Sequence, residues 1–419
     1  MNPSTNADTV AVPPPSAKAL RYYRSGNLLW FVDLAWGLAM PMLWLWTGAS
    51  VRLRDFSWRV GQRWFVALAI YAALYLAISA LLEFPFTYYV SYVRPHSYGL
   101  SHQGFPKWFG DALKRLGVGM LLIALLLWIP YGLMARSPRH WWIYTSLMAV
   151  PVLVSLVLVM PIWFDPLFNR FGPMHDQALE AKILALADRA GIEGGRVYEV
   201  DKGRDTSTVN AYVTGLFGTK RIVLWDTLLA KLSPDEVLCV MGHEMGHFAL
   251  GHVLIGLLLS CLGNLVGLGF IHWTVTRLLR WDWLRTRTGL DRLADVATLP
   301  LLLLVGKVFV LATLPIGLAI SRHQEFEADR FALEITRNNH ACASTFVKLQ
   351  LNNLSHPRPG PFYKLWRASH PSLGDRIDFS NTYRPWTTGD EGRYERYFRS
   401  KGVGPNDEAN SDHASNGPP

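Results

Sequence analysis

The chain alternates between long apolar stretches and segments with the mixed pattern of a water-exposed domain. A helix needs about 20 apolar residues to cross the hydrocarbon core of a bilayer. Stretches of about this length recur six times, and Trp and Tyr gather at their ends, as expected at a membrane–water interface. They are residues 27–47, 64–90, 117–134, 141–164, 253–275 and 298–320. The pattern predicts a membrane protein with six helical spans, of which the third is the shortest.

Residues 165–252 have the pattern of a small soluble α/β unit. Residues 176–191 have helical apolar spacing and end on Gly191, a residue suited to the position after a helix. Short strands are predicted at 196–200, 209–215 and 221–225, the last two joined by the hairpin turn LFGTK. The run SPDE, with Ser233 as N-cap and Glu236 closing a capping box, predicts the start of another helix.

The predicted organisation follows from these patterns. The fold class is mainly α, a multi-span helical membrane bundle with a small α+β domain beside it. Both ends of the chain are polar and rich in small residues, which favours disorder. We expect a disordered tail at 1–20, a membrane region with four spans at 21–164, the first part of the soluble domain at 165–252, two further spans at 253–320, its second part at 321–385 and a second disordered tail at 386–419.

Composition narrows the class of protein. Half of the residues are hydrophobic and 17% are charged, against about 25% charged in an average soluble domain. Much of the basic excess behind the net charge of +9 lies in short loops beside the predicted spans, where it meets lipid headgroups. We therefore expect the lipid bilayer, and no nucleic acid, as a partner. Cys239, Cys261 and Cys342 are widely spaced and predict neither a disulfide nor a thiolate metal site.

The helix that begins after Ser233 carries the motif MGHEMGH. His243 and His247, four residues apart, share a helix face and can bind one metal ion. Glu244 is placed to act as the general base of a metal-dependent peptidase. Two histidines with a purely structural role are the alternative, which the helical context disfavours. In a continuous helix His252 would face about 180° away from His243, so we expect it to be no ligand.

A remote residue must then complete the site. The best candidate lies in SRHQEFEADRFAL, residues 321–333, where Glu325 and Asp329 share a helix face. A carboxylate joining two histidines would leave the fourth zinc position open, as catalysis needs. Asp329 would then orient a ligating imidazole. The same spacing also fits a solvated acidic helix face, and the residues alone leave both interpretations open.

Taken together, MGHEMGHFALGH and SRHQEFEADRFA resemble the gluzincin membrane peptidases of the CAAX prenyl protease type 1 family. The likeness continues through DPLFNRFGPM, VNAYVTGLFGTKRIVLWDTLL and SHPSLGDRI and covers residues 165–385. It implies that the soluble part is a zincin-like metallopeptidase domain. It also implies one Zn²⁺ per chain, held by His243, His247 and Glu325, with Glu244 as the general base.

The resemblance implies further roles. Asn210 would hold an extended substrate peptide, which suits an edge strand. His370 would stabilise the oxyanion of the tetrahedral intermediate, and Asp329 and Arg376 would support the site from behind. Without the resemblance, the local sequence would indicate only that Asn210 is a hairpin residue and that His370 is a surface histidine near a turn.

The expected function is that of an integral, multi-pass membrane zinc metalloendopeptidase acting on peptide or protein substrates, similar to the enzymes that trim prenylated C-termini. Eukaryotic members have seven spans, so six spans and polar tails favour a bacterial relative. We expect the cytoplasmic membrane if the protein is bacterial and the endoplasmic reticulum if it is eukaryotic. A quality-control protease without prenyl preference and a non-catalytic zinc-binding scaffold or transporter remain as alternatives.

Overall fold

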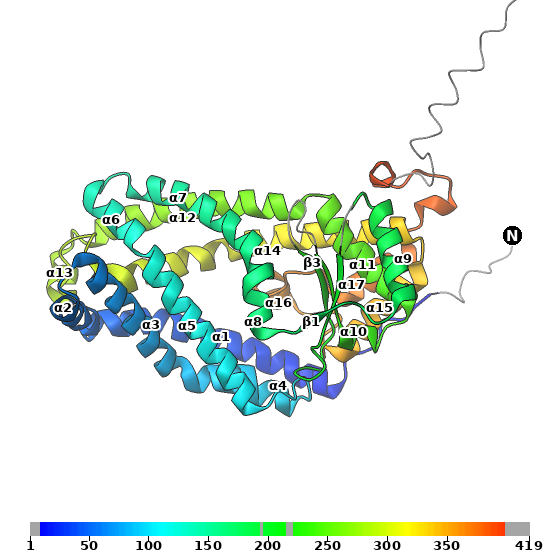
Figure 1. Ribbon diagram of the computed structural model, residues 1–419, viewed down its shortest axis with the longest axis horizontal. Coiled ribbons are helices and arrows are strands. Elements are labelled where there is room, and N and C mark those ends of the chain that lie inside the picture. The colour runs from blue at the N-terminus through cyan, green and yellow to red at the C-terminus, as the bar shows by residue number, and fades with distance from the viewer. Residues whose placement is uncertain (1–8, 193–195, 215–220, 399–419) are drawn as a thin grey trace, which may run out of the picture.

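A computed structural model of the chain describes residues 9–192, 196–214 and 221–398. Within these ranges six helical segments are long and apolar enough to cross a membrane, which confirms the predicted number. The long helices extend along the longest axis of the molecule, away from the small sheet at one end (Figure 1). The segments are α1 (Ala17–Trp46), α3 (Trp64–Tyr88) with its continuation to Ser97, α5 (Phe105–Leu126) with α6 (Trp128–Arg136), α7 (Trp141–Val159), α12 (His252–Leu278) and α14 (Leu299–Thr336).

The third span differs from its prediction. The sequence indicated a short segment at 117–134, whereas the helical segment runs over 32 residues, Phe105–Arg136. Its first turns contain the charged residues Lys107, Asp111 and Lys114. Because of these charges, the first turns are not part of the apolar run from which the span was predicted.

Shorter elements connect the spans and the soluble domain. A helix of 13 residues, α2 (Ala49–Gly61), packs against α3. The remaining short helices are α4 (Arg94–Ser97), α8 (Asp165–Phe168), α9 (Gln177–Arg189), α10 (Asp226–Leu229), α13 (Asp282–Thr288), α16 (Pro361–Trp366) and α17 (Leu373–Thr382). There are also π-helical turns, η1 (Tyr89–Val93) and η2 (Met160–Phe164), and 3₁₀ turns, η4 (Val296–Thr298), η5 (Pro385–Thr387) and η6 (Glu395–Tyr397).

The soluble domain contains a four-stranded sheet with the order β1-β2-β4-β3. Strand β2 runs parallel to β4, whereas the pairs β1–β2 and β3–β4 are antiparallel. Three predicted strands are confirmed, and β3 lies at an edge of the sheet; the predicted turn at 216–220 lies outside the described residues. The bounds are β1 (Phe171–Gly172), β2 (Arg196–Val200), β3 (Ala211–Thr214) and β4 (Arg221–Trp225).

Helix α11 (Pro234–Ala249) lies in the middle of the soluble domain. It begins with the predicted capping box between Ser233 and Glu236. Its Gly242 and Gly246 face α14 at such close range that an added Cβ would lie 3.2 Å from the Cα of Ala332 and 3.1 Å from the Cα of Ala328. The two glycines therefore let the backbones of α11 and α14 approach closely, beside the histidines of the motif.

Helix α15 (Asn339–Asn352) also packs against α11. Glu236 accepts hydrogen bonds from Lys348 and Ser344 on α15, both at 2.6 Å. Cys239 and Cys342 form a disulfide between the same two helices. The expectation of no disulfide was wrong: the two cysteines are 103 residues apart in the chain, and only the packing of α15 on α11 brings them together.

Both predicted disordered tails are wrong in part. Ser16 caps α1, so residues 17–20 are helical, and residues 9–13 lie against α15 and α17, where Val10 pairs with Asn381 through two hydrogen bonds. At the other end Tyr394 is buried in the domain core and its N–H donates to Glu334. Residues 9–20 and 386–398 are ordered by these tertiary contacts, which local composition does not reveal. Residues 1–8 and 399–419 lie outside the described part.

Candidate functional site

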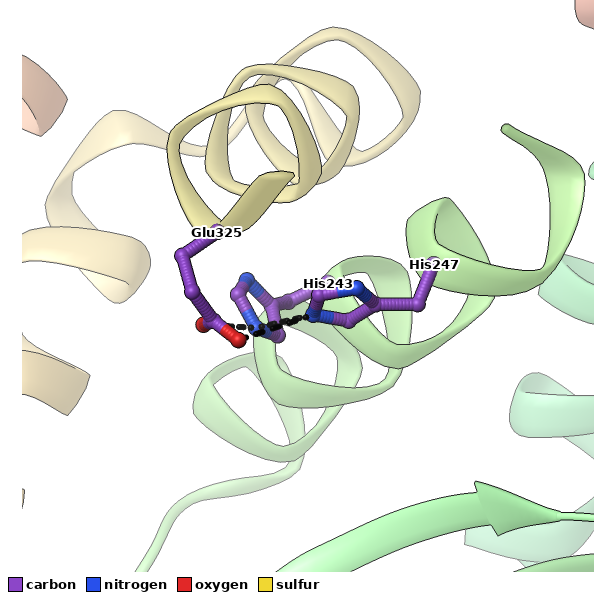
Figure 2. A group of neighbouring side chains, drawn as sticks. All are labelled: His243, His247 and Glu325. Carbon is purple, nitrogen blue, oxygen red and sulfur yellow. Dashed lines mark hydrogen bonds and ion pairs between the residues drawn. The ribbon is translucent and has the colours of Figure 1, made fainter. Parts of the chain in front are cut away.

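Three side chains from two helices converge on one point (Figure 2). Helix α11 carries His243 and His247 one turn apart, and α14 presents Glu325 from the opposite side. The Nε2 atoms of the two imidazoles are 3.2 Å apart. Glu325 Oε2 lies 3.2 Å from His243 Nε2, and its Oε1 lies 3.4 Å from His247 Nε2. The structure therefore brings together the three residues that the sequence singled out, and their ligand atoms all lie within 4.8 Å of one another.

The local chemistry fits a cation at this point. Glu325 Oε2 is buried and has no hydrogen-bond partner among the described residues, although imidazole nitrogens surround it. Burial lowers the pKa of His243, but Asp329 and Glu325 outweigh this effect and raise it to about 10. The surrounding carboxylates thus favour a positive charge where the ring stands, and a metal ion bound at Nε2 would supply that charge. Two imidazoles and one carboxylate are a donor set typical of catalytic zinc sites.

A buried chain of contacts orients His243. Its Nδ1 lies 2.8 Å from Asp329 Oδ1, and Asp329 accepts two hydrogen bonds from the guanidinium of Arg376, one of them 2.8 Å long from Nε. Arg376 in turn lies 4.1 Å above the ring of Phe346. With its Nδ1 proton donated to Asp329, His243 presents the lone pair of Nε2 to the site. Both predicted supporting residues therefore lie directly behind the histidine.

The prediction that His252 faces away from the site is wrong. Helix α11 ends at Ala249, and Gly251, with φ of 69°, turns the chain before α12 begins at His252. Because the helix is interrupted, its angular spacing does not extend to residue 252. The Nδ1 atoms of His252 and His247 are 2.9 Å apart. His252 therefore contacts the Nδ1 side of His247, as Asp329 contacts the Nδ1 side of His243.

Glu244 lies between the histidine pair and the edge strand. Burial raises the pKa of its carboxyl group, while the backbone N–H of Val213 on β3 donates a hydrogen bond to it. A carboxyl group with a raised pKa, beside the cluster of His243, His247 and Glu325 and the outer edge of the sheet, is suited to moving protons during hydrolysis.

The structure also places Asn210 and His370 at the site. Asn210 directly precedes β3 and borders the same cavity as Glu244. His370 Nε2 lies 3.3 Å from Glu325 Oε2, and its Nδ1 lies 2.8 Å from the hydroxyl of Ser369. If that hydroxyl donates to Nδ1, His370 carries its proton on Nε2 and can donate it into the site. Burial lowers the pKa of His370, which keeps the ring neutral at pH 7.

A cavity of about 690 Å³ opens beside these residues. Four residues of its wall were not expected from the sequence: Tyr22 and Gly26 on α1, Arg94 on α4 and Arg367 directly after α16. No local motif marks these positions. The signal that could have indicated them is a charged residue inside or next to an apolar stretch, because such residues often have a functional role.

Comparison with known proteins agrees with this geometry. Residues 173–382 match peptidase family M48, and residues 16–170 match the CAAX prenyl protease N-terminal region, described as five membrane helices. In the described part of that region we find four apolar helices long enough to span and the shorter α2.

Curated relatives cover most of the chain. The protein named "uncharacterized metalloprotease YhfN" of Bacillus subtilis (strain 168) is 35% identical over 375 residues, covering 89% of this chain and 87% of the relative. The CAAX prenyl protease 1 homolog of Dictyostelium discoideum is 31% identical over 315 residues, 73% of this chain and 70% of its own length.

The crystal structure of Ste24p from S. mikatae superposes with a TM-score of 0.75, covering 86% of this chain and 87% of that one at 24% identity. At this identity the likeness supports the fold, and the family assignment depends on the sequence matches. The expected resemblance and fold class are thereby confirmed. The chain belongs to peptidase family M48 and is a membrane metalloprotease of the CAAX prenyl protease type.

Proposed function

We propose that His243, His247 and Glu325 hold one zinc ion per chain and that this site hydrolyses peptide bonds. The observation that carries the proposal is the convergence of the three ligand atoms beside Glu244 and β3, the edge strand of the described sheet. A zinc ion bound there would act as a Lewis acid and lower the pKa of a water molecule toward about 7.

Residues of the chain bind the substrate, transfer the proton and stabilise the developing negative charge. The peptide pairs with β3 as an additional strand, with Asn210 at the start of that edge. The carboxylate of Glu244 accepts a proton from the attacking water and returns it to the leaving amine. The Nε2–H of His370 donates to the carbonyl oxygen as negative charge develops on it. Asp329, Arg376 and His252 keep the two imidazoles in place.

The substrate is reached at the membrane surface. Glu325 lies on α14, the same continuous helix that forms the last span, and α12 begins five residues after His247. We infer that substrates are peptide segments held at or near the bilayer. The Bacillus subtilis relative favours a bacterial cytoplasmic membrane as the location.

The decisive experiment is a peptidase assay on the purified full chain in detergent, with and without a zinc chelator, beside Glu244→Gln. We expect cleavage to stop with the chelator and to return with added zinc. In Glu244→Gln cleavage should fall by at least about 100-fold, the usual contribution of a general base, while bound zinc stays at one per chain. Full activity in Glu244→Gln would disprove the proposed mechanism.

Whether the substrate must carry a prenyl group is tested separately, by comparing the cleavage of three substrates. A farnesylated CAAX peptide, the same peptide without the lipid and an unfolded membrane protein are offered to the same enzyme. Preference for the farnesylated peptide would assign it to prenyl-protein processing. Equal cleavage of all three would indicate the quality-control function instead.

A further inference from the structure

One arginine of α14 holds the end of α16 and the backbone that follows it. Arg322 donates two hydrogen bonds from its Nη1 atom, one to the carbonyl oxygen of Lys364 at 2.7 Å and one to that of Ala368 at 2.8 Å. The last carbonyl groups of a helix have no partner within that helix, and α16 ends at Trp366. Arg322 therefore provides the partner for one of these carbonyl groups and ties the next turn of the chain to α14.

A second contact continues along the same backbone. The hydroxyl of Ser321 donates to the carbonyl oxygen of Ser369 at 2.8 Å, and the hydroxyl of Ser369 lies 2.8 Å from His370 Nδ1. The carbonyl groups of Ala368 and Ser369, the two that directly precede His370, are thus both bonded to side chains of α14. The backbone that carries the imidazole is fixed by neighbouring residues of one helix.

The same helix also carries Glu325, beside which the imidazole of His370 lies. Glu325 follows Arg322 by three residues, so their side chains are neighbours on the helix surface, about 4.5 Å apart along its axis. His370 Nε2 lies 3.3 Å from Glu325 Oε2. A single continuous helix therefore sets the position of His370 relative to the point where the three ligand atoms converge.

We propose that Arg322 is a positioning residue for His370. By holding the backbone between residues 364 and 368, it keeps the Nε2–H of His370 at the place where negative charge develops on the carbonyl oxygen, and Ser321 supports the same placement at residue 369. An oxyanion donor is effective only at hydrogen-bonding distance from that oxygen, and a displacement of about 1 Å can cost about 100-fold in rate. This inference rests on the proposed peptidase function and adds to it a residue that acts through His370.

The test is a double-mutant cycle between Arg322→Ala and His370→Ala, measured as peptide cleavage by the zinc-loaded full chain in detergent. Loss of an oxyanion donor lowers kcat by about 100-fold or more, and we expect loss of its support in Arg322→Ala to lower kcat by about tenfold. Because the donated bond forms only as charge develops, KM should stay within about twofold of the wild type. In the His370→Ala background, Arg322→Ala should lower kcat no further, since no donor is left to position.

Three further variants define the source of the effect. Arg322→Lys keeps the charge without the planar guanidinium, and its kcat should lie between those of the wild type and Arg322→Ala. Ser321→Ala removes a single hydrogen bond, so it provides the test if Arg322→Ala does not fold. It should lower kcat by about threefold, and only while His370 is present. Arg358→Ala is the matched control, because this arginine pairs with two aspartates at the surface and should cleave like the wild type.

Binding of a phosphinic peptide with leucine on both sides of the phosphinate gives a reading that needs no turnover. The tetrahedral phosphinate imitates the intermediate of hydrolysis, and titration calorimetry on the zinc-loaded proteins measures its affinity directly. We expect the wild type to bind it about tenfold more tightly than Arg322→Ala. His370→Ala and the double variant should bind it with equal affinity.

The outcomes separate the two proposals. Wild-type kcat and affinity in Arg322→Ala, or an equal loss with and without His370, would overturn the positioning role and leave the peptidase function standing. Coupling between the two residues in phosphinate binding, without zinc-dependent cleavage, would support the positioning role and count against the proposed catalytic function. A protein that cleaves no peptide and whose variants all bind the phosphinate equally would contradict both.

Discussion

His243 and His247 each have a partner on the ring nitrogen that faces away from Glu325. For His243 the partner is Asp329, fixed in turn by Arg376, and for His247 it is His252. Such partners set the tautomer and the ring orientation of a ligating imidazole. If Nδ1 of His252 accepts this hydrogen bond, His247 carries its proton on Nδ1 and its Nε2 lone pair is available to a metal ion. At the residue scale, a second side chain therefore orients each imidazole of the pair.

We predict that His252→Ala lowers zinc affinity by about 10- to 100-fold, the usual effect of removing such a partner. The measurement is a zinc competition titration of the purified variant with a chromogenic chelator. His175→Ala is the control, because the side chain of His175 is 88% exposed and bonded to Glu199. Unchanged zinc affinity in His252→Ala would show that the contact with His247 is incidental.

At the scale of elements, the approach of α11 to α14 creates the site. The glycine before each histidine of the motif lies on the face that meets α14, so His243 and His247 on one helix lie within reach of Glu325 on the other. An added Cβ at Gly246 would lie 3.0 Å from Phe331 Cβ as well as 3.1 Å from Ala328 Cα. Backbone atoms and buried side-chain atoms cannot easily move apart to relieve contacts as short as these.

Gly246→Ala should therefore destabilise the protein by about 1–3 kcal/mol, the usual cost of overpacking a core, and weaken zinc binding by separating the helices. Thermal unfolding in detergent measures the first effect and zinc titration the second. For comparison, Gly256→Ala on α12 adds a methyl group where no atom lies within 4 Å. If both variants unfold at the wild-type temperature, close packing at Gly246 is not what holds α11 and α14 together.

At the scale of the whole molecule, the soluble domain is assembled from distant parts of the chain. Two membrane spans separate α11 from the segment that carries Glu325, and residues 9–13 pack on α15 and α17 near the other end of the sequence. The disulfide between Cys239 and Cys342 closes a loop of 103 residues across these spans. It thereby joins the two halves of the domain independently of the membrane region.

Removing this link should cost about 2–5 kcal/mol, as for other native disulfides. We predict that Cys239→Ser/Cys342→Ser unfolds at a lower temperature than the wild type, and that a reductant lowers the unfolding temperature of the wild type but not of the double variant. Cys261, the free cysteine, provides the control Cys261→Ser. Two free thiols at 239 and 342 in mass spectra of the native protein would refute the prediction.

Features that depend on neighbouring residues were predictable from the sequence. Six spans follow from apolar length, the start of α11 from its capping box, and the pairing of His243 with His247 from the helical repeat. The sequence also marked Glu325 and Asp329 as candidates by their shared helix face. In each case one local rule of geometry or solvation applies whatever the rest of the chain does.

Only the tertiary structure decided the contacts between distant segments. Gly251 interrupts the helix and turns His252 back toward His247, and the packing of α15 on α11 joins two cysteines that appeared unrelated. Arg94 and Arg367, far apart in the chain, meet at Gly26 because α1, α4 and the end of α16 converge there. These contacts arise from the packing of whole elements, which no local pattern encodes. The sequence alone therefore indicated the class of enzyme and the three residues at the centre of the candidate metal site, whereas the contacts that orient these side chains emerged from the fold.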